Sequence, residues 1–131
     1  MRFRVEVRQI KREGEDLDSL IRWIARSFGL ASDRGNNTCL NILKELLLEF
    51  KRKGFVTSQE LAQSLNLSRE IVNYHLRTLM ACGLIYRERN RYYLRGRTLR
   101  ESIEELERDI ERILINIKDI AESIDKILGL Y

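Results

Sequence analysis

Two short stretches of the sequence concentrate side chains that can make several directed hydrogen bonds. The first stretch contains Ser68, Arg69, Asn73, Tyr74 and Arg77, and the second contains Arg87, Arg89, Asn90 and Arg91. An arginine can donate two hydrogen bonds to the edge of guanine, and an asparagine can pair with adenine. We therefore predict that Arg69 and Asn73 read DNA bases and that Tyr74 and Arg77 contact bases or phosphates. Ser68 and the amides beside it can bind a phosphate if a helix begins there, because a helix N-terminus attracts anions.

A helix-turn-helix is the element that must position the first stretch. Thr57 and Glu60 have the spacing of a capping box, in which both side chains accept hydrogen bonds at the start of a helix. After a short helix from residue 58, Asn66 supplies the turn and Ser68 caps a second helix of about residues 69–82. The predicted buried faces are Leu61, Ala62 and Leu65 in the first helix and Val72, Leu76, Leu79 and Met80 in the second. The side chains of the first stretch therefore point outward.

An arginine-rich β-hairpin must position the second stretch. Residues 84–87 and 91–94 are rich in aromatic and β-branched side chains, which predicts two strands, and Asn90 in the link supplies the turn. Residues 86–100 hold six arginines and one acid, a net charge of +5. The tip of such a hairpin can enter a minor groove or hold phosphates. The alternative is an edge hairpin whose charges serve only solubility.

The remaining patterns divide the chain into three parts. Alternating side chains predict a half-buried strand over residues 2–10, and helical spacing predicts helices over residues 16–28 and 37–53. We expect an N-terminal strand and helix over residues 1–35, a winged helix-turn-helix domain over residues 36–97 and a C-terminal helix over residues 98–131. The predicted fold class is mainly α with a small β-hairpin, a winged helix-turn-helix followed by a long dimerisation helix.

An unbroken seven-residue repeat predicts the C-terminal helix. Its apolar positions alternate spacings of four and three from Leu99 to Tyr131, with no glycine between Gly96 and Gly129. This pattern predicts a coiled-coil-type helix of about 33 residues that outruns the small domain and self-associates. The predicted dimerisation residues are Ile103, Leu106, Ile110, Ile113, Ile117, Ile120, Ile124 and Ile127. Because isoleucine at both positions disfavours a two-stranded coil, we expect the helix over residues 16–28 to pack against the tail in a four-helix assembly across a two-fold axis.

The run from Leu67 to Ile85 resembles the recognition helix and first wing strand of ArsR-type and MarR-type winged-helix repressors. The matching features are the cap at Ser68, Val72 four residues later, His75-Leu76 and the closing Gly83-Leu84-Ile85. The resemblance extends over about residues 37–95 and implies a winged-helix fold and a role in transcription. The metal-sensing branch of these families is not expected, because His75 is the only histidine and no second cysteine or histidine has ligand spacing.

Charge and cysteine content narrow the class of protein further. Residues 101–131 carry a net charge of −5, and since the whole chain carries +4, residues 1–100 carry +9. A basic body favours a polyanionic partner. Cys39 and Cys82 each lie in an apolar helical pattern, which predicts buried free thiols. The first ten residues lack a signal-peptide pattern and no apolar run reaches the roughly 20 residues of a membrane span, so we expect a cytoplasmic protein without membrane contact.

These patterns together favour a homodimeric, sequence-specific transcriptional regulator, a repressor rather than an activator. It would bind double-stranded DNA at a pseudo-palindromic site, because a two-fold dimer presents two recognition helices about one DNA turn apart. No arrangement of residues indicates an enzyme or a cofactor, and the sequence does not identify an effector. Two alternatives stay open, a winged-helix module that docks proteins in a transcription or other multi-subunit complex and an RNA-binding protein.

Overall fold

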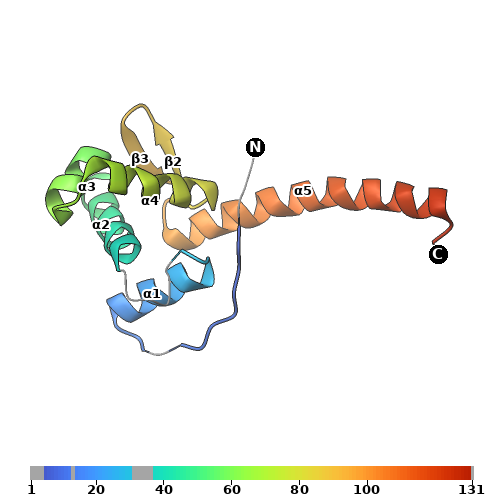
Figure 1. The fold of residues 1–131 in the computed structure, drawn as a ribbon, viewed down its shortest axis with the longest axis horizontal. Helices are drawn as coiled ribbons and strands as arrows, with labels where there is room; N and C mark the ends of the chain where they lie inside the picture. Colours follow the sequence, from blue (N-terminus) through green and yellow to red (C-terminus); the bar gives the residue numbers. More distant parts are fainter. Residues whose placement is uncertain (1–4, 13, 31–36, 131) are drawn as a thin grey trace.

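The computed structural model describes residues 5–12, 14–30 and 37–130, and these residues form five helices and three short strands. In chain order the elements are α1 (Leu17–Ser27), α2 (Thr38–Lys53), β1 (Val56–Thr57), α3 (Ser58–Leu65), α4 (Arg69–Ala81), β2 (Ile85–Glu88), β3 (Arg91–Leu94) and α5 (Leu99–Leu128). Figure 1 shows the first four helices and the strands gathered at one end, with α5 projecting away from them. This arrangement is the predicted winged helix-turn-helix with a long C-terminal helix.

Polar side chains cap the helices where the sequence predicts their starts. The Thr57 hydroxyl accepts a hydrogen bond from the Glu60 amide at 3.1 Å, and the Ser68 hydroxyl accepts one from the Ile71 amide at 3.2 Å. Each cap satisfies an amide that has no partner inside its helix. Asn66 adopts the left-handed conformation between α3 and α4, with φ at 53°. The predicted helix-turn-helix is therefore confirmed. Of the predicted capping box only the bond to the Glu60 amide forms, because the Glu60 carboxylate accepts hydrogen bonds from the Thr57 hydroxyl and from Lys53.

The hydrophobic core lies between α2, α3, α4 and one face of the sheet. Its fully buried side chains include Ile42, Leu43 and Leu46 from α2, Leu61 from α3, Val72, Leu76 and Leu79 from α4, and Val56 and Ile85 from the strands. Burying one such side chain contributes roughly 1.5–3 kcal/mol relative to leaving it in water. Cys39 and Cys82 are buried free thiols, as predicted. The core thus fixes which face of α4 remains outside.

The sheet is antiparallel with the strand order β1-β3-β2. Its first strand was not predicted, because two residues are too few to show alternation. Glu88 pairs with Arg91, so the hairpin closes through the two-residue turn of Arg89 and Asn90. The left-handed residue in this turn is Arg89, with φ at 59°, and not Asn90 as the sequence suggested. A hairpin turn needs positive φ at its first central residue whatever side chain stands there.

The predicted strand over residues 2–10 is wrong for its described part, because residues 5–10 form no strand. Two hydrogen bonds hold this segment against α1 instead. The Arg8 amide donates to the Ser27 carbonyl at 2.7 Å, and the Trp23 indole donates to the Ile10 carbonyl at 2.7 Å. Val5 and Val7 line an apolar groove beside α5, where Val5 is half-buried and Val7 is 74% exposed, so their alternation corresponds to no pairing in a sheet. Residues 2–4 lie outside the described part.

The long helix α5 spans 30 residues and ends at Gly129, whose φ is 71°. Its first half packs on the domain, where Ser102, Leu106 and Asp109 are buried. In its second half the apolar side chains are exposed, including Ile120 at 64% and Ile127 at 83%. Within the chain α1 packs against α2, and Lys44 and Asp18 form an ion pair across that contact. No helix in the described residues is both long and apolar enough to cross a membrane.

Candidate nucleic-acid interface

The exposed face of α4 is set by the residues that α4 buries. Val72, Leu76 and Leu79 are completely buried against the core, so the opposite side of the helix faces solvent. The turn before α4 is held by the Leu67 amide, which donates to the Ala62 carbonyl at 2.9 Å. Ser68 is exposed at the helix start. The helix therefore presents both a free N-terminal end and a free side.

The predicted recognition side chains lie on this free side of α4. Tyr74 is 60% exposed, and Arg69 and Arg77 are also exposed. Asn73 is half-buried, so less of its amide group reaches solvent. The Arg69 guanidinium donates a hydrogen bond to the Ser58 hydroxyl at 3.2 Å, which draws this side chain toward the start of α3. Tyr74 and Arg77 are accordingly the most accessible of the predicted base contacts.

Ile71 is an exposed residue of α4 that is not among the predicted contacts. Its side chain is 44% exposed, although isoleucine usually lies inside. It stands three residues before Tyr74, so the two side chains share one face of the helix. That spacing is the signal that could have identified it. An exposed aliphatic side chain on such a helix can contact the methyl group of thymine.

His75 lies beside this face but is half-buried. Its ring meets the Tyr74 ring edge-on, with 5.1 Å between the centroids. Burial lowers the pKa of His75 below its ordinary value of 6.5, because the charged imidazolium loses hydration. The neutral form is therefore favoured at pH 7, so His75 adds little positive charge to this face.

The hairpin of β2 and β3 carries the second predicted stretch. Arg87, Arg89, Asn90 and Arg91 are all exposed, and Figure 1 shows the hairpin beside α4. The Arg87 guanidinium donates to the Arg89 carbonyl, and the Arg91 guanidinium lies 4.1 Å above the centroid of the Phe55 ring. Such contacts reduce the freedom of both arginines without removing their charge. The tip therefore presents three cations from a braced hairpin.

An aromatic row stiffens the outer face of this hairpin. Tyr86 and Tyr93 are cross-strand partners whose rings stack with centroids 5.1 Å apart. Phe55 continues the row, with its centroid 6.2 Å from that of Tyr93. Cross-strand aromatic pairs of this kind contribute roughly 0.2–1 kcal/mol each. The row gives a rigid base to the arginines at the tip.

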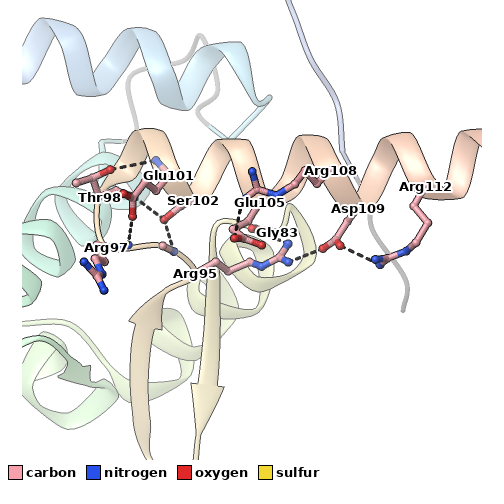
Figure 2. Close-up of polar contacts among 11 residues, drawn as sticks. Gly83, Arg95, Arg97, Thr98, Glu101, Ser102, Glu105, Arg108, Asp109 and Arg112 are labelled. Carbon is pink, nitrogen blue, oxygen red and sulfur yellow. Dashed lines mark hydrogen bonds and ion pairs between the residues drawn. The ribbon is translucent and has the colours of Figure 1, made fainter.

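Not every arginine of the basic segment lies at the tip. Arg95, at the end of β3, forms an ion pair with Asp109 of α5, and Arg112 contacts the same carboxylate at 2.9 Å (Figure 2). Arg100 lies near Glu104 within α5. The charge count assigned all six arginines to the hairpin, because a linear count cannot see acids that approach from a later helix. The +5 of this segment thus overstates the charge that the wing offers to a partner.

Comparison with known proteins identifies the domain that carries these features. Residues 41–94 match a family model described as an HTH domain, a span that runs from α2 to the end of β3. No curated protein and no solved structure gives a significant match. The match does not name the ArsR-type or MarR-type families, so that narrower resemblance stays a prediction. Residues 41–94 therefore resemble a helix-turn-helix domain and are folded in this chain as a winged helix, and the match supports binding to DNA.

Proposed function

We propose that the protein is a homodimeric transcriptional repressor that binds a pseudo-palindromic site in double-stranded DNA. The observation that carries this proposal is the exposed face of α4 beside three hairpin arginines, within a domain that matches a helix-turn-helix family. Winged-helix domains of this kind place the second helix in the major groove and let the wing contact the backbone or minor groove. Repression by occluding a promoter requires no further chemistry.

The side chains divide between base reading and phosphate binding. Arg69, Asn73, Ile71, Tyr74 and Arg77 contact bases or adjacent phosphates in the major groove. Ser68 and the first amides of α4 bind a phosphate, because the helix N-terminus carries partial positive charge. The wing contacts the phosphate backbone or the minor groove of the DNA through Arg87, Arg89, Asn90 and Arg91.

Self-association is the second part of the proposal. The second half of α5 exposes Ile117, Ile120, Ile124 and Ile127, together with Leu114 and Leu128. A contiguous apolar stripe of this length is unusual on a monomeric surface and is typical of an interface. Two copies joined through these stripes would carry two reading domains related by a two-fold axis.

Selection of bound sites from a random pool of duplex DNA tests the proposal directly. We expect a recovered sequence with two inverted half-sites and a Kd that rises with salt concentration. The double variant Arg89→Ala with Arg91→Ala should flatten the slope of log affinity against log salt by about 3.6, because each of the two protomers loses two phosphate contacts and each contact contributes about 0.9. The matched control is Arg108→Ala with Lys126→Ala, which removes the same charge from exposed positions on α5. An unchanged slope in the hairpin variant would exclude phosphate contact by the wing.

Two further variants separate specificity from association. Arg69→Ala should relax sequence preference while retaining non-specific binding, and equal loss on all sequences would contradict a base contact. Deleting residues 114–131 should halve the mass measured by light scattering while leaving the buried Leu106 and Asp109 in place. A dimer that survives this deletion would remove α5 from the interface.

The alternative functions give different outcomes in the same assays. A module that docks proteins would show no salt-dependent binding to duplex DNA even at low salt. An RNA-binding protein would retain structured RNA against excess duplex DNA. Either result would replace the repressor proposal.

A further inference from the structure

Hydrogen bonds from the backbone hold the short connection between β3 and α5 in place. It consists of Arg95, Gly96, Arg97 and Thr98, and the first three of their amides donate to fixed acceptors. The Arg95 amide donates to the Leu84 carbonyl at 3.1 Å, the Gly96 amide to the Ser102 hydroxyl at 2.9 Å and the Arg97 amide to the Glu101 carboxylate at 2.9 Å. The start of α5 is therefore tied to the end of the sheet.

Gly96 lets the backbone of this connection pass very close to α5. A Cβ atom placed at Gly96 would lie 2.5 Å from the Glu101 Cβ and 2.7 Å from the Ser102 amide nitrogen. Any larger side chain would push the connection and the helix apart. The first turn of α5 is thus a fixed pivot.

A second attachment lies two turns further along α5, at Asp109. This side chain is 9% exposed, and its carboxylate lies between the guanidinium groups of Arg95 and Arg112 (Figure 2). Arg95 is itself mostly buried and also reaches the Gly83 carbonyl, at 3.5 Å, immediately after α4. Arg95, which lies at the end of the wing, therefore contacts both the residue that follows the C-cap of α4 and the long helix α5.

We propose that the Arg95–Asp109 ion pair is a positioning contact that fixes the direction of α5 relative to α4 and the wing, and so sets the spacing of the two DNA half-sites. The inference rests on the proposed function, because half-site spacing has meaning only for a DNA-binding dimer. Without this contact α5 would be held by its pivot and by apolar contacts that tolerate sliding. The ion pair defines one direction because both of its partners are nearly buried.

Because α5 is long, a small change in its direction produces a large displacement of the proposed dimer interface. The exposed isoleucines of the proposed interface run from Ile117 to Ile127, which lie about 12–27 Å beyond Asp109 along a helix that rises 1.5 Å per residue. A change of roughly 10° at Asp109 would move these residues by about 2–5 Å at that rise per residue. A shift of one base pair moves a half-site by about 3.4 Å and turns it by roughly 34° about the DNA axis. Because the two protomers share this change, each copy supplies about half of the shift and half of the turn, so loosening the ion pair in both copies would widen the range of spacings that the dimer accepts.

Duplexes in which the spacer between two inverted half-sites varies one base pair at a time test this role. The half-site is taken from the random-pool selection. We expect the wild-type protein to prefer one spacing over its neighbours by about tenfold, which corresponds to about 1.4 kcal/mol. Asp109→Ala should reduce this preference to threefold or less while binding to a single half-site changes by less than twofold.

The control variant is Glu105→Ala, which removes an ion pair with Arg108 that lies wholly within α5. It should keep the wild-type spacing preference. If Asp109→Ala does not fold, Asp109→Asn retains the shape of the side chain and removes its charge, and the same loss of preference is expected. If the ion pair only stabilises the fold, its loss in the Asp109 variants would lower the melting temperature without altering the spacing preference. That result would overturn the inference.

A distance measurement tests the ion pair independently of DNA. Spin labels are attached through Gln63→Cys on α3 and Glu122→Cys on α5, two exposed positions. The native Cys39 and Cys82 are buried and have pKa values raised to about 11, so they resist labelling. Labelled chains are diluted with unlabelled chains to isolate distances within one copy. The distribution should broaden in Asp109→Ala but not in Glu105→Ala, and equal widths would overturn the inference. Failure of the wild-type protein to bind any duplex would instead reject the proposed function.

Discussion

The two halves of α5 carry the same seven-residue repeat in different surroundings. In the first half Leu106 is 3% exposed, because it packs on the domain. In the second half Ile120 occupies the same position of the repeat and is 64% exposed. The same apolar repeat is therefore found on a buried face and on an exposed one, so the repeat alone does not show what a face contacts.

The two halves of α5 also differ in the burial of the polar residues at another position of the repeat. Ser102 and Asp109 are seven residues apart, and both are buried. Ser102 bonds with the Gly96 amide and the Thr98 carbonyl, and Asp109 pairs with Arg95. The next residues in this series, Asn116 and Ser123, are exposed. A buried polar group needs a partner, so these partners mark where the helix belongs to the domain.

Truncating the two equivalent apolar positions should give the largest contrast. Leu106→Ala should lower the free energy of unfolding by about 2–5 kcal/mol, because it leaves a cavity in a packed site. Ile120→Ala should change it by less than about 0.5 kcal/mol at protein concentrations where the chain is monomeric. Denaturant unfolding followed by circular dichroism measures both. Equal losses would mean that both halves are packed in the same way.

Charging the second half should break the proposed dimer without unfolding the domain. Ile117→Asp with Ile124→Asp removes two apolar contacts of roughly 1.5 kcal/mol or more each, so the Kd of the dimer should rise at least about 100-fold. Ile115→Asp is the matched control, since Ile115 is 49% exposed, close to the 50% of Ile124, but lies outside the two repeat positions. Sedimentation at several concentrations measures the Kd. If the control dissociates equally, the repeat does not define the interface.

Local chemistry made most of the fold predictable. The hydroxyls of Thr57 and Ser68 determine helix starts within four residues of themselves, and Asn66 determines the turn between them. These contacts do not depend on the rest of the chain. The segment over residues 5–10 was assigned wrongly because alternation alone cannot distinguish a sheet edge from a helix surface. Here the sheet of the described residues consists of β1, β3 and β2, and Val5 and Val7 line a groove beside α5 instead.

The candidate interface was predictable where outward direction follows from helical spacing. Tyr74 and Arg77 are exposed because Val72, Leu76 and Leu79 are buried. The role of Arg95 was not predictable, since its partner Asp109 is 14 residues away on another element. The bond from Arg69 to Ser58 was missed for the same reason. Contacts between elements depend on packing that no local pattern encodes.

Two glycines flank α5, Gly96 in the connection before it and Gly129 at its C-terminal end, and substitutions there should affect stability differently. Gly96→Ala should lower the free energy of unfolding by about 1–3 kcal/mol, because the added methyl group meets the backbone of α5. Gly129→Ala places a methyl group in open space, although its φ of 71° disfavours alanine. That strain lies in the last turn, which can fray without unfolding the domain. Thermal unfolding of both variants checks the order, and a larger loss at Gly129 would contradict it.

The smallest expected effect is the pH dependence of the stability that Asp109 contributes in the first half of α5. The hydrogen bond from Arg95 lowers the pKa of Asp109 below its ordinary value of 3.8, because it favours the ionised carboxylate. A group whose pKa is lower in the folded state stabilises the fold above its unfolded pKa and loses that contribution as pH falls through the folded pKa. The difference in unfolding free energy between the wild type and Asp109→Asn should therefore be constant from pH 7 to about pH 5 and shrink below about pH 4.

The control for this pH dependence is Arg95→Gln, alone and combined with Asp109→Asn. Without the guanidinium the pKa of Asp109 loses its main cause of depression, so the difference between the carboxylate and the amide should vary much less below pH 4. Denaturant unfolding at each pH gives the four free energies of the cycle. An identical pH profile in the presence and absence of Arg95 would show that another group stabilises the carboxylate. Asp109 would then not be what joins the first half of α5 to the wing, and the two halves would differ by apolar packing and by the hydrogen bonds of Ser102.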